Sequence, residues 1–255
     1  MKKMNTLFVA WHAKDPHSDK EPVWGPIGRL EFENGVYRFC YTHGAKSLRG
    51  FQPFDGMEDV SQVYESSKLF PLFANRLLPP SRPEFRAYLT WSGFDPDDPP
   101  EPLLLLGRTG GIKQTDAIEL FPRPVPNSQG CYVNFFFAHG VRYHLPNAAP
   151  ALSQLQIGDR LELRPQPLNP ADQNAVVIRS NATPIGYVPR YLASDVKRLI
   201  EECPEQEVRI VVQRINHDAP IQQRLLCRLQ ACWPVGFQPC EGEQFQPIVS
   251  RCNVA

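Results

Sequence analysis

The sequence predicts an α+β protein of two domains, a small α+β domain followed by a mostly β domain with one or two helices. Three observations support this prediction. Asn34-Gly35 lies between two alternating apolar segments, which is typical of a β-hairpin. Three prolines between Pro122 and Pro126 form a stiff connector. Beyond it, short alternating segments precede an apolar pattern of helical spacing.

In the N-terminal part, strands are expected at residues 5–11, 25–32 and 36–41, with a polar loop at 12–22. Helical patterns are expected at residues 60–64, 69–78 and 82–91, and they are punctuated by Pro79-Pro80 and by the proline-rich stretch 95–100. Another apolar run ends in Gly107-Arg108-Thr109-Gly110-Gly111. This stretch lacks the Lys-Ser/Thr of a phosphate-binding loop, so we interpret its glycines as a helix C-cap and a turn.

In the C-terminal part, the strand at 131–137 carries three phenylalanines expected in the core. Further strands are predicted at 161–165, 175–178 and 185–188, a helix at 191–200, and two paired strands at 207–212 and 225–233. The resulting division is a domain at 1–122, a linker at 123–130, a domain at 131–233 and an extension at 234–255. The extension is either loose or lies along the N-terminal domain.

The charges exclude one class of function. The chain has 27 basic and 27 acidic side chains, so its formal net charge is zero. From Asn127 onward, 12 Lys and Arg face 11 Asp and Glu. Nonspecific binding of duplex DNA through a broad basic face is therefore not expected. A small site that uses two arginines remains open.

The seven cysteines form no CxxC pair, and their odd number argues against a complete disulfide framework. Zinc usually takes closely spaced cysteine pairs, so we expect reduced thiols, no metal and no cofactor. The apolar run at residues 7–11 is too short for a signal peptide, and no stretch reaches the roughly 20 apolar residues of a membrane span. We expect a cytoplasmic protein without a membrane partner.

Asn169, Asp172 and Asn174 crowd into one turn between two apolar strands. The simplest explanation is local, because Asn and Asp side chains bond to their own backbone in turns. The wider pattern suggests more. GDxLxLxxxxxNPxDxNAVxI from Gly158, followed by IGYVPRxLA, resembles the HIRAN domain of Rad5-like and helicase-like DNA remodellers and of bacterial proteins. The segment 137–144 (FAHGVRYH) looks like that family's opening strand, and the resemblance covers residues 131–215.

This resemblance implies an OB-like β-barrel that holds the 3′-hydroxyl end of single-stranded DNA. It implies that Arg142 contacts a phosphate and that Tyr143 stacks on a base. Asn169 and Asp172 match the polar turn, in which the aspartate accepts the terminal hydroxyl, and Arg190 matches a basic residue that faces a phosphate. A carboxylate accepts a hydrogen bond from a hydroxyl and repels a phosphorylated end, so it would select the end.

The chain departs from the family at Ala171, where the known end binders carry an aromatic residue. A lost stacked ring costs about 1–3 kcal/mol per base. Either Tyr187 or Tyr191 takes its place, or end binding is weak. The aromatic residue that closes the family's pocket late in the domain is also not identifiable near residues 217–222.

A second resemblance covers residues 5–122. GRLEF with the strand after it, LFANRLLPP and LLLLGRTGG are similar to the N-terminal subdomain of HipA-type toxin kinases. No kinase core follows in this sequence. The resemblance implies a protein partner, a kinase or a DNA-processing enzyme, for residues 1–122.

The motifs of common enzyme classes are absent from the sequence, which has no nucleophile elbow, P-loop or HExxH. His139 and His144 would face opposite sides of an extended strand, which makes a poor metal pair. We therefore expect a non-catalytic protein. It recognises single-stranded DNA 3′ ends through Arg142, Tyr143, Asn169, Asp172, Tyr187 and Arg190. The alternative is an antitoxin-like module that binds a HipA-type kinase, in a toxin–antitoxin, repair or anti-phage setting.

Overall fold

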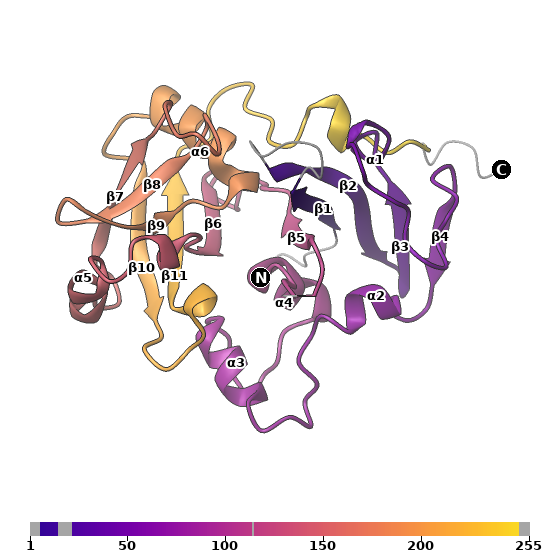
Figure 1. Ribbon diagram of the computed structural model, residues 1–255, viewed down its shortest axis with the longest axis horizontal. Coiled ribbons are helices and arrows are strands. Elements are labelled where there is room, and N and C mark those ends of the chain that lie inside the picture. The colour runs from indigo at the N-terminus through magenta and orange to yellow at the C-terminus, as the bar shows by residue number, and fades with distance from the viewer. Residues whose placement is uncertain (1–5, 15–21, 114, 250–255) are drawn as a thin grey trace. The chain divides into compact units, whose positions relative to one another are not determined.

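The computed structural model describes residues 6–14, 22–113 and 115–249. The architecture is mixed α+β, as the sequence predicts (Figure 1). The contacts divide the chain into two compact units. The first comprises the described residues up to Leu78, Pro100–Arg123 and the described residues from Cys240; the second comprises Pro79–Pro99 and Pro124–Pro239. The domain limits read from the sequence remain predictions.

The first unit is built on a five-stranded antiparallel sheet in the order β4-β3-β2-β1-β5. Its strands are β1 Thr6–Lys14, β2 Pro22–Glu33, β3 Val36–Tyr41, β4 Val63–Ser66 and β5 Ile118–Pro122. β1 and β2 pair as far as Lys14 and Pro22, so both are longer than predicted. The central part of the predicted loop, residues 15–21, lies outside the described residues.

The hairpin predicted at Asn34-Gly35 is confirmed. Glu33 pairs with Val36, and the two turn residues have φ angles of 52° and 80°. Positive φ at both central positions defines the turn that matches the twist of paired strands. Glycine takes this conformation without steric cost, and asparagine tolerates it.

The helices of the first unit are short: α1 Gly44–Ser47, α2 Pro71–Ala74 and α4 Pro102–Thr109. The helix predicted at 60–64 is wrong, because Tyr64 pairs with Phe39 in the edge strand β4. Of the helix predicted at 69–78, only α2 forms. The interpretation of the glycine-rich stretch is confirmed, since α4 ends at Gly110 with φ 72°. Phe73, Leu103 and Leu106 from these helices are buried in one core with the sheet.

The described residues from Cys240 belong to the first unit. Pro247 forms a bridge with Thr42, and the Ile248 N–H donates to the Tyr41 carbonyl at 2.9 Å. Of the two alternatives for the C-terminal extension, this part follows the second and lies along the N-terminal domain.

The second unit has a six-stranded antiparallel sheet in the order β6-β11-β10-β7-β8-β9, curved into a half-barrel (Figure 1). Its strands are β6 Tyr132–Phe137, β7 Arg160–Pro165, β8 Val176–Ser180, β9 Thr183–Tyr187, β10 Arg209–Ile215 and β11 Leu225–Ala231. All six were predicted, and β10 and β11 are paired as expected. Phe136 and Phe137 are buried, whereas Phe135 is only partly buried, so two of the three phenylalanines lie in the interior as predicted.

Three helices complete this unit: α3 Phe85–Trp91, α5 Ala149–Gln154 and α6 Arg190–Glu202. α6 begins after Pro189, which cannot donate a backbone hydrogen bond and suits a helix start. Leu192, Val196 and Leu199 lie three or four residues apart on α6, and all are buried in the core of the sheet. The sequence predicted this helix and its apolar face.

The expectation of reduced thiols is wrong for one pair. Cys203 follows α6 and Cys232 follows β11, and the fold brings their Cα atoms to 6.0 Å, where they form a disulfide. The late cysteines Cys227 and Cys240 are separately buried, and Cys252 lies outside the described residues. Within the described ranges, no group of three or more His, Cys, Asp or Glu side chains could hold a metal. No described helix has the length and hydrophobicity needed to cross a bilayer.

Candidate functional site

Three of the predicted site residues, Arg142, Tyr143 and Tyr187, lie at or close after the point where the two edges of the second unit's sheet meet. β6 and β9 are opposite edge strands, but His139, just after β6, bridges to Tyr187 at the end of β9. The His139 N–H donates to the Tyr187 carbonyl at 2.9 Å, and the Tyr187 N–H donates back at 2.8 Å. This bridge brings segments together that are almost 50 residues apart in the sequence.

Arg142 and Tyr143 are not on a strand, contrary to the prediction for 137–144. Gly140 has φ 66°, which ends the extended chain, and Val141–Tyr143 forms a 3₁₀ turn. A Cβ added at Gly140 would lie 3.0 Å from Tyr187 Cδ2 and 3.4 Å from Tyr143 Cδ2. Both aromatic rings therefore approach the backbone at this glycine, and a larger residue would push them away.

Arg142 and Tyr143 form a pair at the surface. The guanidinium carbon of Arg142 lies 4.7 Å from the centre of the Tyr143 ring, and Arg142 Nη2 donates to the Tyr143 hydroxyl at 2.6 Å. Tyr143 is 71% exposed. The guanidinium has five N–H donors, so this bond leaves the others for an anion. In the described part of the chain, no carboxylate is within ion-pair distance of Arg142.

Tyr187 is held by several neighbours. Its ring centre lies 5.2 Å from that of His144, and its hydroxyl donates to Gln166 Oε1 at 3.3 Å. Tyr191, the other aromatic considered in place of Ala171, instead contacts the ring of His139 in a T-shaped arrangement at 6.3 Å. The hydroxyl of Tyr187 is thus bonded directly to Gln166, the first residue of the turn that carries Ala171.

The turn at 166–175 forms the local bonds that the simplest explanation predicts. Asn169 Oδ1 accepts from the Ala171 N–H at 3.0 Å, and Asp172 Oδ1 accepts from the Asn174 N–H at 2.8 Å. Asn169 Nδ2 also donates to Gln166 Oε1 at 3.1 Å. Much of the hydrogen-bonding capacity of Asn169 is therefore used within the turn.

Asp172 keeps acceptor capacity beyond the turn. Its Oδ2 lies 3.7 Å from Arg190 Nε, a distance typical of an ion pair rather than a hydrogen bond. The side chains of Arg190 and Asp172 are 34% and 18% exposed. Since a carboxylate offers about four lone-pair positions, Asp172 Oδ2 is able to accept a further hydroxyl donor.

Together these side chains offer three kinds of contact to a ligand. Tyr143 offers an aromatic face, Arg142 offers donors for a phosphate, and Asp172 offers a charged acceptor beside Arg190. A base, a phosphate and a hydroxyl are the groups that such side chains recognise.

Sequence reasoning missed three contributors: Gly140, His144 and Gln166. The left-handed turn at Gly140 could have been suspected from the glycine beside the Arg-Tyr pair, whereas Gln166 carries no local signal. Burial lowers the pKa of His144 from its usual value. Its Nε2 is buried and has no hydrogen-bond partner among the described residues.

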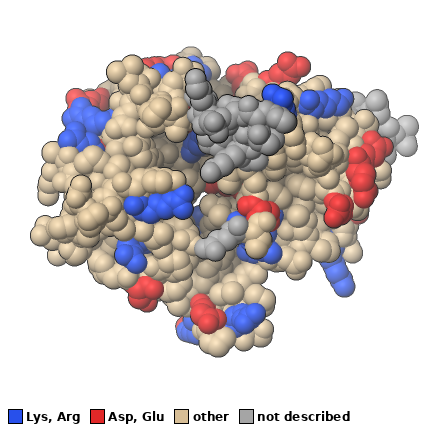
Figure 2. Space-filling view, in the orientation of Figure 1, with Lys and Arg blue, Asp and Glu red and all other residues tan. Residues whose placement is uncertain are grey.

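The charges do not form an extended basic surface on the face seen in Figure 2, where Lys and Arg alternate with Asp and Glu. This pattern agrees with the zero net charge. Binding of nucleic acid here would depend on a few placed contacts rather than on a broad positive field.

Comparison with known proteins assigns part of the chain. The family model of the HIRAN domain matches residues 132–230, so the chain carries a HIRAN domain in this region. The N-terminal half is unassigned, and its resemblance to HipA-type kinases remains a prediction. No curated protein matches the chain.

Two solved structures are similar to part of the chain. A crystallised protein from Lactobacillus plantarum is 21% identical over 40% of this chain and 96% of its own, with a TM-score of 0.32. The HIRAN domain of human HLTF is 16% identical over 42% of this chain and 84% of its own, with a TM-score of 0.29.

Proposed function

We propose that the HIRAN domain in residues 132–230 binds the 3′ end of single-stranded DNA. HIRAN domains act as DNA-end-binding modules, and the six residues expected from that resemblance lie within the second unit. In this proposal Arg142 contacts a backbone phosphate, Tyr143 stacks on a base, and Asp172 accepts the terminal hydroxyl while Arg190 balances its charge.

The observation that carries the proposal is the pairing of Arg142 with the exposed ring of Tyr143. A 71% exposed tyrosine lies beside an arginine that has no carboxylate partner among the described residues, so the pair offers a stacking surface and a phosphate donor together. Asp172 selects the chemical form of the DNA end. A 3′-phosphate placed against Asp172 would be repelled, whereas a hydroxyl can donate to it.

The test uses the full chain and fluorescence anisotropy with labelled oligonucleotides at one stated salt concentration. The probes are a single strand with a 3′-hydroxyl, the same strand with a 3′-phosphate, and a blunt duplex. We expect preferential binding of the strand with the free 3′-hydroxyl. Equal binding of the two single strands would remove end recognition, and no binding to any probe would overturn the proposal.

We further propose that the protein is not an enzyme and that residues 1–122 recruit or regulate a partner, which is a kinase or a DNA-processing enzyme. The alternative is an antitoxin-like module in which the HIRAN domain no longer binds DNA. Co-purification of the full chain with a HipA-type kinase, without binding to any oligonucleotide, would favour this alternative.

A further inference from the structure

The turn that should contact the terminal base carries no aromatic side chain of its own. Ala171 lies at the position where the family resemblance implies a ring, and Ala171 is exposed. An aromatic ring supplied from another strand is therefore needed if the base is to be stacked on both sides. Tyr187 at the end of β9 is linked to this turn through a single side chain, Gln166.

Gln166 is fixed at the end of the ladder between β7 and β8. Its N–H donates to the Ala175 carbonyl at 2.8 Å, and its carbonyl accepts from the Asn169 N–H at 2.9 Å. The backbone of Gln166 is thus held on both sides, which restricts where its side chain can lie. A side chain on a fixed backbone can hold a neighbour in place at a low entropic cost.

The side-chain oxygen of Gln166 joins two of the predicted site residues. It accepts from Asn169 Nδ2 at 3.1 Å and from the Tyr187 hydroxyl at 3.3 Å. A carbonyl oxygen has two lone pairs, so these two donors use its capacity. The amide therefore couples the position of the Tyr187 ring to the conformation of the turn.

The other contacts of Tyr187 differ in kind from the hydrogen bond between its hydroxyl and Gln166. The ring contacts His144 at a centre distance of 5.2 Å and approaches Gly140, and both contacts are apolar or aromatic. Such contacts limit the space for the ring but do not orient its hydroxyl. The hydrogen bond to Gln166 supplies that orientation.

We infer that Gln166 is a positioning residue that holds the Tyr187 ring where it replaces the aromatic side chain absent at Ala171. This inference rests on the proposed binding of a DNA end. It assigns a role to a residue that is bonded to two site residues, and it gives Tyr187 a defined function as the second stacking surface beside Tyr143.

The test is a double-mutant cycle in the full chain, with anisotropy of the 3′-hydroxyl strand as readout. Gln166→Met keeps the side-chain length and removes the acceptor, and Tyr187→Phe keeps the ring and removes the donor. Each is expected to weaken binding about 3- to 10-fold, in line with one lost hydrogen bond. Because both changes break the same bond, the double variant should bind no more weakly than either single variant.

A matched control is available in the same turn. Gln173 is exposed, and Gln173→Met makes the same chemical change away from Tyr187, so it should leave the affinity unchanged. Gln166→Glu keeps an acceptor for both donors, so its affinity should stay close to that of the wild type. Adding Tyr187→Phe to Gln166→Glu should then weaken binding as much as Tyr187→Phe does alone. Thermal unfolding of every variant checks that the affinity changes do not follow from loss of the fold.

The outcomes separate this inference from the proposed function. If the wild-type chain binds the 3′-hydroxyl strand but Gln166→Met behaves like Gln173→Met, or the two single effects add, only the role of Gln166 is overturned. If the wild-type chain binds none of the strands, both ideas fail.

Discussion

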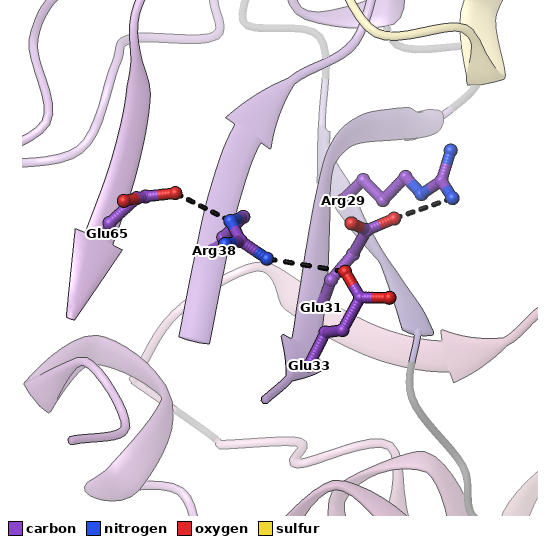
Figure 3. A network of polar contacts seen from close by, with 5 residues as sticks. All are labelled: Arg29, Glu31, Glu33, Arg38 and Glu65. Carbon is purple, nitrogen blue, oxygen red and sulfur yellow. Dashed lines mark hydrogen bonds and ion pairs between the residues drawn. The ribbon is translucent and has the colours of Figure 1, made fainter. Parts of the chain in front are cut away.

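Arg38 of the first unit and Arg142 of the second are surface arginines in different surroundings. Arg38 on β3 lies between carboxylates of the two neighbouring strands, with Nε 2.5 Å from Glu65 and Nη1 3.4 Å from Glu33 (Figure 3). Arg29 on β2 is also paired with a carboxylate, that of Glu31 on the same strand, at 2.5 Å. Arg142, by contrast, stacks on the exposed ring of Tyr143.

The difference shows that arginines in a chain of zero net charge can differ in the partners that they already have. A cavity of about 400 Å³ in the first unit is lined by Arg29, Glu31 and Arg38 among others, so its cations already face carboxylates. A phosphate would have to displace these carboxylates. At Arg142 a phosphate would meet donors that no described carboxylate occupies, so the composition of a surface matters less than the partners of each arginine.

The largest effect is expected at Arg76, the buried arginine of the first unit. Its side chain is 1% exposed, and it bonds to Asp116 at 2.6 Å and to the Gly111 carbonyl at 2.9 Å. Asp116→Ala would leave a buried charge without its carboxylate, which should lower the free energy of unfolding by about 3–5 kcal/mol.

Urea denaturation measures this change, and Glu65→Ala on the exposed network is the control, with little expected effect. A similar loss of stability in both variants would contradict the distinction between buried and exposed arginine pairs.

A smaller effect, on binding rather than stability, is expected at Arg142. Arg142→Ala should lower the affinity for the 3′-hydroxyl strand about 10-fold, because it removes charge-assisted contacts to a phosphate. It should also reduce the slope of log affinity against log salt by about 0.7, the value for one phosphate contact on a single strand.

Arg38→Ala, the same change on the paired network, should leave both quantities unchanged. If the two variants weaken binding equally, the contrast between the two units has no functional meaning.

A weaker effect is expected on the preference for a 3′-hydroxyl end over a 3′-phosphate end. Asp172→Asn can still accept from the Asn174 N–H, so the turn should persist while the negative charge is lost. Its preference for the 3′-hydroxyl over the 3′-phosphate should fall about 5-fold, because the phosphorylated end is no longer repelled.

Asp159→Asn provides the control, since Asp159 also accepts from a backbone N–H in a turn, that of Gln156 at 2.8 Å. An unchanged preference in Asp172→Asn would remove the role of Asp172 as the end-selecting residue.

The sequence predicted those parts of the fold that depend on local signals. Asn34-Gly35 determines a hairpin through its own φ angles, and the spacing of Leu192, Val196 and Leu199 determines the face of α6. Residues 60–64 were misread because the pairing of Tyr64 with Phe39 is nonlocal. No window around Tyr64 contains the strand that it joins.

For the candidate site, too, the sequence predicted local features but not contacts between distant segments. Asn169 and Asp172 were identified from their own turn, and the turn has the predicted local bonds. The 3₁₀ turn at Arg142 and the contact between Gln166 and Tyr187 depend on how β6, β7 and β9 come together. Such contacts between distant segments leave no pattern in a single sequence, so Gln166 was found only in the structure.

The smallest effect is expected from the pH dependence of two buried acids, one in each unit. Burial raises the pKa of Glu119 on β5 to about 8, and it raises the pKa of Asp195 on α6 to about 7 although Arg198 opposes the shift. At pH values between the pKa of an unfolded carboxyl group and these raised pKa values, the native state binds more protons than the unfolded state. The free energy of unfolding should therefore fall as pH rises through this window.

Glu119→Gln replaces one of these two acids by a side chain that does not titrate, so its contribution to the pH dependence is lost. Between pH 6 and 7, the fall in unfolding free energy should be smaller in Glu119→Gln than in the wild type, by about 1 kcal/mol. Asp195→Asn should reduce the fall by less over the same interval, because Asp195 begins to ionise within it. Urea denaturation at the two pH values measures both slopes. Equal slopes in Glu119→Gln and the wild type would mean that Glu119 is already ionised in the native first unit.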